Sequence, residues 1–139
     1  MRYLLSILLL GSFLLIPSYS YSQDIPNDQA IRAIIGEDSS SYEGMYAVAC
    51  AIRNRGTLKG VYGLKAIRWS EGSLKRFKGT REVETISAET FHQASKAWFS
   101  SESGIDVTKG ATHWEMKSSF PWWAKSMTVT LILNNVFYK

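Results

Sequence analysis

The chain has 139 residues, of which 45% are hydrophobic, and a formal net charge of +4 from 16 basic and 12 acidic residues. This length suits one domain with one core, and the single cysteine, Cys50, excludes an internal disulfide. The mildly basic composition suits an anionic partner and does not by itself exclude nucleic acid.

The N-terminal residues have the pattern of a secretory signal peptide. Arg2 gives a short positive region, and an uncharged, apolar run over residues 3–16 follows it. Ser20 and Ser22 both fit the position before a cleavage site, so the sequence allows cleavage after either residue. The alternative is an uncleaved membrane anchor, although the run is short for a spanning helix.

We therefore expect a signal peptide over residues 1–22 and one globular domain over residues 23–139. The domain would be exported to the periplasm, the cell envelope or the extracellular space. It contains no second long apolar run, so we expect no stable membrane insertion after signal removal. Export also argues against a nucleic-acid partner.

Apolar residues at helical spacing predict a first helix over about Asp28–Glu37, with Asn27 as its N-cap. A loop over residues 38–41 follows, so Glu37 stands at a helix–loop junction. A carboxylate mounted there can reach into a cleft while its backbone stays rigid, which general acid catalysis requires.

A second helix is predicted over about Ser41–Arg55, with Gly56 at the left-handed helix end. Ser40 and Glu43 match a capping box, in which the Ser40 hydroxyl caps a backbone amide and Glu43 reaches back. This role accounts for Glu43 without any chemistry. The alternative is that Glu43 is a second carboxylate of the cleft.

Recurring glycines predict an irregular segment over residues 57–85, with one helical turn around Leu74–Phe77. A third helix, capped by Ser87, is predicted over about Ala88–Ser100.

The last part of the chain is predicted to contain strands. A short strand is expected over Ala111–Glu115, and a hairpin over Thr128–Leu133 and Val136–Lys139. Its turn would be Asn134-Asn135, since asparagine tolerates positive φ. The predicted fold class is therefore α+β, mainly α, with a small C-terminal β-hairpin.

Two ordered blocks of the sequence carry a family resemblance. The first block holds Gly36-Glu37, Tyr42-Glu43-Gly44-Met45, Ala47-Val48-Ala49, Ile52 and Asn54-Arg55. The second holds Asp106, Thr108, Gly110-Ala111-Thr112-His113-Trp114, Pro121, Trp123-Ala124 and Phe137-Tyr138. In these blocks the chain resembles the SleB-like cell wall hydrolases, the family that includes the spore-cortex-lytic enzymes.

The resemblance implies that residues 23–139 form a cell wall hydrolase catalytic domain, which is small, lysozyme-like and helical and cleaves peptidoglycan glycan strands. It carries the family's catalytic acid, the Glu of a Gly-Glu pair, to Glu37. Family members are described as lytic transglycosylases, which cut between N-acetylmuramic acid and N-acetylglucosamine and leave a 1,6-anhydro end. The chain departs from the family pattern in the loop over residues 38–41 and at Leu133-Asn134-Asn135, where the family has Gly-Asn-His.

Most glycosidases use two carboxylates, but a lytic transglycosylase can use one. Glu37 would first give its proton to the leaving oxygen and then take one from the sugar's 6-hydroxyl, which attacks the anomeric carbon. Such an acid needs partial burial among apolar groups, which Ile34 and Ile35 beside it would supply. The alternative is a solvent-exposed glutamate at a helix end.

Six further residues are candidates for substrate binding: Tyr42, Asn54, His113, Glu115, Trp122 and Trp123. His113 and Glu115 would share one face of a strand, and tryptophan rings can stack on sugars. Each candidate could instead have a structural role. A tryptophan could pack in the core, and Asn54 could help to close the helix.

Arg53 and Arg55 could bind muramyl carboxylates or stem peptides, or could be solvated charges that complement the helix dipole. No cofactor and no metal are expected, because two histidines and one cysteine do not support a zinc site.

The sequence thus predicts a monomeric enzyme that cleaves peptidoglycan glycan strands, with Glu37 as its acid. One alternative is a hydrolytic muramidase or glucosaminidase that uses the same site. The other is a non-catalytic peptidoglycan-binding domain.

Overall fold

The computed structural model describes residues 24–139, so the predicted signal peptide lies outside the described residues. The described part contains four α-helices, one 3-10 helix and six strands, which form two three-stranded antiparallel sheets. Within residues 24–139, none of the helices combines the length and the apolar character that crossing a bilayer requires.

The prediction of a mainly helical, lysozyme-like domain with one hairpin is wrong, because the chain has a mixed α+β fold. The sequence predicts an irregular segment over residues 57–85, yet these residues contain the whole of a sheet of order β1-β2-β3. Its strands are β1 (Ile67–Ser70), β2 (Ser73–Lys78) and β3 (Arg81–Thr85). The segment Leu74–Phe77, expected to be helical, lies inside β2.

Weak hydrophobic patterning hides this first sheet from the sequence. Every residue of β3 is exposed, and β2 has one buried residue, Leu74. Strand alternation is visible in a sequence only where one face is buried. Gly72 and Gly79 make the two turns with φ of 76° and 65°, so these glycines connect strands.

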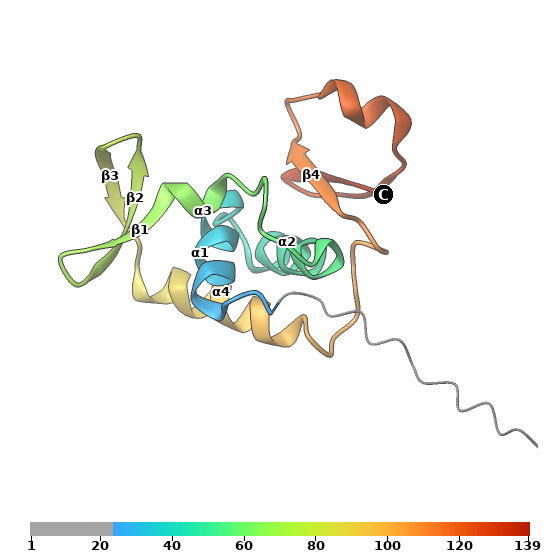
Figure 1. Ribbon diagram of the computed structural model, residues 1–139. Helices are drawn as coiled ribbons and strands as arrows, with labels where there is room; N and C mark the ends of the chain where they lie inside the picture. The colour runs from blue at the N-terminus through green and yellow to red at the C-terminus, as the bar shows by residue number, and fades with distance from the viewer. Residues whose placement is uncertain (1–23) are drawn as a thin grey trace, which may run out of the picture.

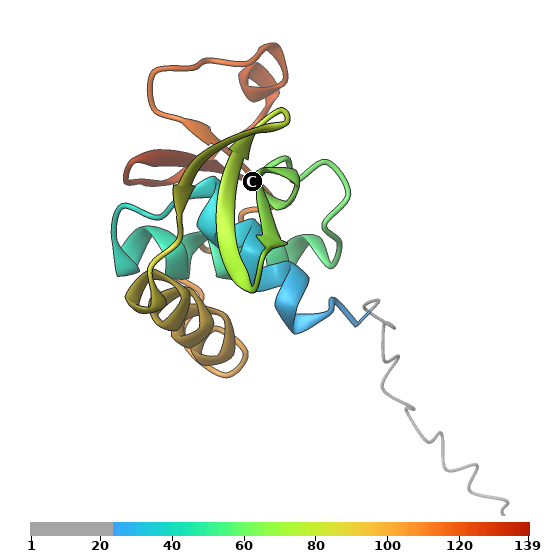
Figure 2. The same ribbon diagram turned by 90° about the vertical axis from the view of Figure 1, so that its left-hand side faces the viewer.

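The three long helices were predicted at nearly the observed positions. They are α1 (Asn27–Glu37), α2 (Tyr42–Arg55) and α4 (Ala88–Ser100), and a short α3 (Gly63–Ala66) follows α2. α1 contacts each of the other three, and their apolar faces form most of the core. Figure 1 shows these helices between the two sheets, and Figure 2 looks from the side of the first sheet.

Two predicted helix ends are confirmed and one is not. Gly56 ends α2 with φ of 71°, and the Ser87 hydroxyl accepts a hydrogen bond from the Thr90 amide at 3.1 Å. Asn27, in contrast, is the first residue of α1 and caps nothing. Its side-chain oxygen accepts a hydrogen bond from Trp98 Nε1 at 2.8 Å, which joins α1 to α4.

Ser41, and not Ser40, caps α2: its hydroxyl accepts from the Gly44 amide at 3.0 Å. We expect Ser41→Ala to lower the free energy of unfolding by about 1 kcal/mol, the usual loss for an N-cap. Urea denaturation measures this. Thr57→Ala, which changes a hydroxyl outside any helix N-terminus, is the comparison. An equal loss in both variants would contradict the capping role.

The second sheet has the order β4-β6-β5, with β4 (His113–Met116), β5 (Val129–Ile132) and β6 (Asn135–Tyr138). The predicted C-terminal hairpin is therefore confirmed, and β4 extends it to three strands. The predicted turn differs, because Asn135 is buried as the first residue of β6 and neither Asn134 nor Asn135 has a positive φ. A 3-10 helix, Trp122–Ser126, lies in the projecting loop between β4 and β5 (Figure 1).

Candidate functional site

Glu37 is the last residue of α1, and its carboxyl group is held by two donors from other elements. Its Oε1 accepts a hydrogen bond from the Gly63 amide of α3 at 2.8 Å. Its Oε2 accepts one from Trp114 Nε1 of β4 at 3.2 Å. The side chain is half-buried. A carboxyl group held on both oxygens has a fixed orientation, which acid–base catalysis requires.

Two glycines make this arrangement sterically feasible. A Cβ atom on Gly36 would overlap the Gly63 carbonyl, and one on Gly63 would lie 2.7 Å from the Glu37 amide nitrogen. The end of α1 and the start of α3 therefore approach each other backbone to backbone. This approach brings the Gly63 amide within hydrogen-bonding distance of Glu37.

Two adjoining hollows meet at Glu37. The first, of about 540 Å³, is lined by Gly36, Glu37, Arg55, Gly60, Tyr62, His113, Trp114, Glu115, Met116, Trp123 and Asn135. The second, of about 450 Å³, is lined by Ile35, Gly36, Glu37, Asp38, Ser39, Ser40, Arg76, Glu84, Met116, Asn134 and Asn135. We call these the aromatic hollow and the polar hollow. Glu37 lines both, so a linear molecule could pass it on either side.

The free edge of β4 forms one wall of the aromatic hollow. All four residues of His113–Met116 line it, although side chains alternate between the two faces of a strand. β4 pairs only with β6, which leaves its other edge unpaired within the sheet. Such an edge offers backbone N–H and C=O groups to a ligand.

Three predicted substrate-binding residues share the aromatic hollow with Glu37: His113, Glu115 and Trp123. The half-buried Trp123 ring lies 5.3 Å from the His113 ring and 5.4 Å from the Tyr138 ring. Glu115 Oε1 accepts a hydrogen bond from the Met116 amide at 3.0 Å. These residues come from β4 and the 3-10 helix, so the second sheet brings them to α1.

Four predicted site residues lie elsewhere. Glu43 is exposed in the first turn of α2 and lines neither hollow, and Trp122 is 82% exposed and also lies outside both. The Tyr42 ring packs near Tyr46, with the Lys96 ammonium 5.2 Å from its centroid.

Asn54, the fourth, connects α2 to the loop before β4. Its side-chain amide donates to Asp106 Oδ2 at 2.9 Å and to the Ala111 carbonyl at 3.0 Å. Burial alone would raise the pKa of Asp106, but hydrogen bonds from Thr108, Asn54 and Gly110 outweigh it and lower that pKa. In this position Asn54 supports the loop that leads into β4.

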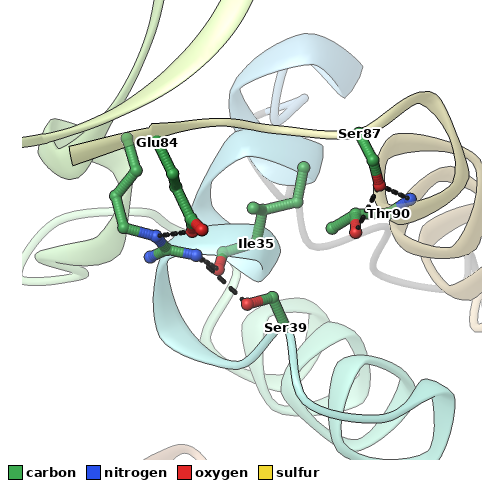
Figure 3. A network of polar contacts seen from close by, with 6 residues as sticks. Ile35, Ser39, Glu84, Ser87 and Thr90 are labelled. Atoms are coloured by element: carbon green, nitrogen blue, oxygen red, sulfur yellow. Dashed lines mark hydrogen bonds and ion pairs between the residues drawn. The ribbon is translucent and has the colours of Figure 1, made fainter. Parts of the chain in front are cut away.

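The lining residues that the sequence did not indicate include Tyr62, Met116 and Arg76. Arg76 Nε of β2 pairs with Glu84 of β3 at 2.8 Å. Its guanidinium also donates to the Ile35 carbonyl at 3.3 Å and to the Ser39 hydroxyl at 3.1 Å, as Figure 3 shows. No sequence signal pointed to Arg76, because the first sheet was not predicted.

The loop after Glu37 is tied to the C-terminal hairpin. Asp38 Oδ1 accepts hydrogen bonds from the Ser40 amide at 2.9 Å and the Ser40 hydroxyl at 2.6 Å. The Asn134 side chain in turn donates to the Ser40 hydroxyl. The serine loop and the Asn134 turn therefore meet at one rim of the polar hollow.

The pKa of His113 is lowered, first by burial and then by the positive charge of Arg55. The His113 ring therefore binds a proton more readily in the unfolded chain than in the folded one. The stability that the neutral ring contributes is full above the unfolded pKa near 6.5 and is lost as the pH falls toward the lower folded pKa.

We expect His113→Gln to lose less unfolding free energy than the unchanged protein between about pH 7.5 and about pH 5. Urea titrations at the two pH values measure this, and an equal loss of unfolding free energy in both proteins would contradict it.

Among residues 24–139, no group of three His, Cys, Asp or Glu side chains is arranged to hold a metal ion. The sequence matches no protein-family model and has no match among curated proteins or solved structures. Function is therefore inferred from the residues of the site and their geometry.

Proposed function

We propose that the chain cleaves the glycan strands of peptidoglycan as a lytic transglycosylase, with Glu37 as its only catalytic carboxyl group. The observation that carries the proposal is the position of Glu37, half-buried where the two hollows meet and held by Gly63 and Trp114. A glycan strand that runs through both hollows would place one glycosidic bond at this carboxyl group. The resemblance to the SleB-like hydrolases supports the same substrate class.

The reaction needs one proton donor that becomes a proton acceptor. Protonated Glu37 gives its proton to the glycosidic oxygen as the bond from that oxygen to the muramyl C1 breaks. The muramyl 6-hydroxyl then attacks C1, and its proton returns to the Glu37 carboxylate. The products are a 1,6-anhydromuramyl end and a free N-acetylglucosamine 4-hydroxyl. No water molecule is consumed.

The aromatic hollow suits a sugar ring. Trp123 and Tyr62 both line it, and aromatic rings offer apolar area to the C–H faces of sugars. The free edge of β4 offers backbone groups that can bind the amide of an N-acetyl substituent. Action on this substrate would require export, for which residues 1–22 have the expected pattern.

A second candidate function, hydrolysis, is favoured by the position of Glu115. A hydrolytic muramidase or glucosaminidase needs a carboxylate that activates water or acts as the nucleophile. Glu115 lines the aromatic hollow together with Glu37, whereas Glu43 does not. Glu115, and not Glu43, would then be the second carboxylate.

Digestion of purified peptidoglycan sacculi, with mass spectrometry of the products, tests both functions. We expect 1,6-anhydromuramyl products from the unchanged protein and from Glu115→Gln. Reducing-end products that disappear in Glu115→Gln would replace transglycosylation by hydrolysis. Absence of any product, with retained binding to the sacculi, would overturn both and leave a peptidoglycan-binding domain.

A further inference from the structure

Arg55, at the end of α2, brings a positive charge into the aromatic hollow that no carboxylate of residues 24–139 pairs with. Its guanidinium donates to the Lys59 carbonyl at 2.6 Å and to the Thr112 carbonyl at 3.4 Å. It also lies 5.8 Å from the centre of the Trp114 ring. These two hydrogen bonds use two of the five N–H donors of a guanidinium group, and the others remain for a ligand.

Arg55 and Glu115 meet the wall of the aromatic hollow at different points along the chain. Arg55 contacts the start of β4 at Thr112, whereas Glu115 lies three residues further along the chain. Three residues of extended chain span about 10 Å. The backbone contact of Arg55 and the position of Glu115 therefore lie about 10 Å apart along this segment.

The two hollows differ in this respect. Arg76 lines the polar hollow, but its charge is balanced by Glu84 at 2.8 Å. Arg55 has no such partner among the described residues. The lowered pKa of His113, to which Arg55 contributes, is a second sign that this positive charge acts inside the aromatic hollow.

We infer that Arg55 is a specificity-determining residue, which binds a carboxylate carried by the muramyl sugar through the remaining donors of its guanidinium. This inference rests on the proposed glycan substrate. The carboxylate is that of the lactyl group. A guanidinium is suited to it, because its planar fork can bind both carboxylate oxygens.

This contact fixes the direction of the strand. The muramyl sugar would occupy the aromatic hollow, beside Arg55, and the neighbouring N-acetylglucosamine would occupy the polar hollow. Cleavage between them then releases N-acetylglucosamine from the polar side. The muramyl sugar, whose 6-hydroxyl must attack, stays in the hollow with the aromatic rings.

Binding to the Glu37→Gln protein tests the inference without turnover. The probe is a peptide-free tetrasaccharide of alternating N-acetylglucosamine and N-acetylmuramic acid, and tryptophan fluorescence reports its binding. The comparison ligand is the same tetrasaccharide with its lactyl carboxylates converted to methylamides. We expect the methylamide to bind about tenfold more weakly, since one charge-assisted contact is lost. Equal binding of the two ligands, or no binding of either, would overturn the inference.

Variants then assign the preference to Arg55. Arg55→Gln should bind both ligands equally, and Arg55→Lys should retain part of the preference because it keeps the charge without the fork. Arg81→Gln, which removes a charge on exposed β3, should keep the full preference. An undiminished preference in Arg55→Gln would overturn the inference. The ligand comparison in the parent protein does not depend on how well Arg55→Gln folds.

A third ligand, with a stem peptide on each lactyl group, tests whether a peptide carboxylate can replace the lactyl one. Binding as weak as that of the methylamide restricts the contact to the free lactyl carboxylate, and binding as tight as that of the free acid shows that Arg55 also binds a peptide carboxylate. The outcome is independent of catalysis. An Arg55-dependent preference without cleavage of sacculi would reject only the proposed function, and cleavage without this preference would reject only the Arg55 inference.

Discussion

Glu37→Gln should lower the rate of glycan cleavage by about 10²–10⁴-fold, the usual contribution of one general acid–base group. Glutamine keeps the size of the side chain and its oxygen can still accept a hydrogen bond from the Gly63 amide, but it cannot carry the transferred proton. Because the proposed reaction uses Glu37 both as acid and as base, no other group would compensate. The measurement is the initial rate of anhydromuramyl release from sacculi.

Glu43→Gln is the matched control, since it removes the same carboxylate six residues further along the chain at an exposed position. We expect it to cleave sacculi at the unchanged rate. The thermal unfolding midpoints of both variants should lie near that of the unchanged protein. Full activity in Glu37→Gln, or a loss of equal size in Glu43→Gln, would reject Glu37 as the catalytic acid.

Gly36→Ala should lower the free energy of unfolding by about 3 kcal/mol, the upper part of the usual range for overpacking. Its new Cβ atom would overlap the Gly63 carbonyl, and backbone atoms cannot turn aside as a side chain can. α1 and α3 would have to separate, which would also move the Gly63 amide from Glu37. Urea denaturation and the rate of sacculus cleavage would show both losses together.

Gly79→Ala is the comparison for this variant. Gly79 lies in a turn with φ of 65°, and a Cβ atom there would meet nothing within 4 Å. We expect a loss of about 1 kcal/mol from the left-handed backbone alone and no loss of activity. If Gly36→Ala were no less stable than Gly79→Ala, the close approach of α1 and α3 would not matter.

The helices could be predicted from the sequence because their signals are local. Apolar residues at helical spacing, Ser87 before α4 and Gly56 after α2 act within one or two turns of the chain. The sequence indicated Ser40 as the cap of α2, whereas Ser41 is the cap in the structure. Local signals cannot separate the two, since neighbouring serines offer the same hydroxyl. The C-terminal hairpin was predicted for a similar reason, because its two strands are adjacent in the chain.

The first sheet could not be predicted in this way. The exposed β3 carries no apolar alternation, and glycines in turns have the same appearance in a sequence as glycines in an irregular loop. Arg76 lies on β2, so its place in the lining of the polar hollow could not be predicted without that sheet. The fold class was wrong for this single reason.

For the site, the sequence by itself determined that Glu37 ends a helix beside apolar residues and that His113, Glu115 and Trp123 lie in the C-terminal part of the chain. Only the tertiary structure decided that these residues line one hollow, that Gly63 and Trp114 hold the Glu37 carboxyl group, and that Glu43, Tyr42, Asn54 and Trp122 lie outside it. The physical reason is distance along the chain. Helix caps and turns depend on neighbours within a few residues, whereas Glu37 and Trp114 are brought together by the packing of a helix against a sheet edge 77 residues away.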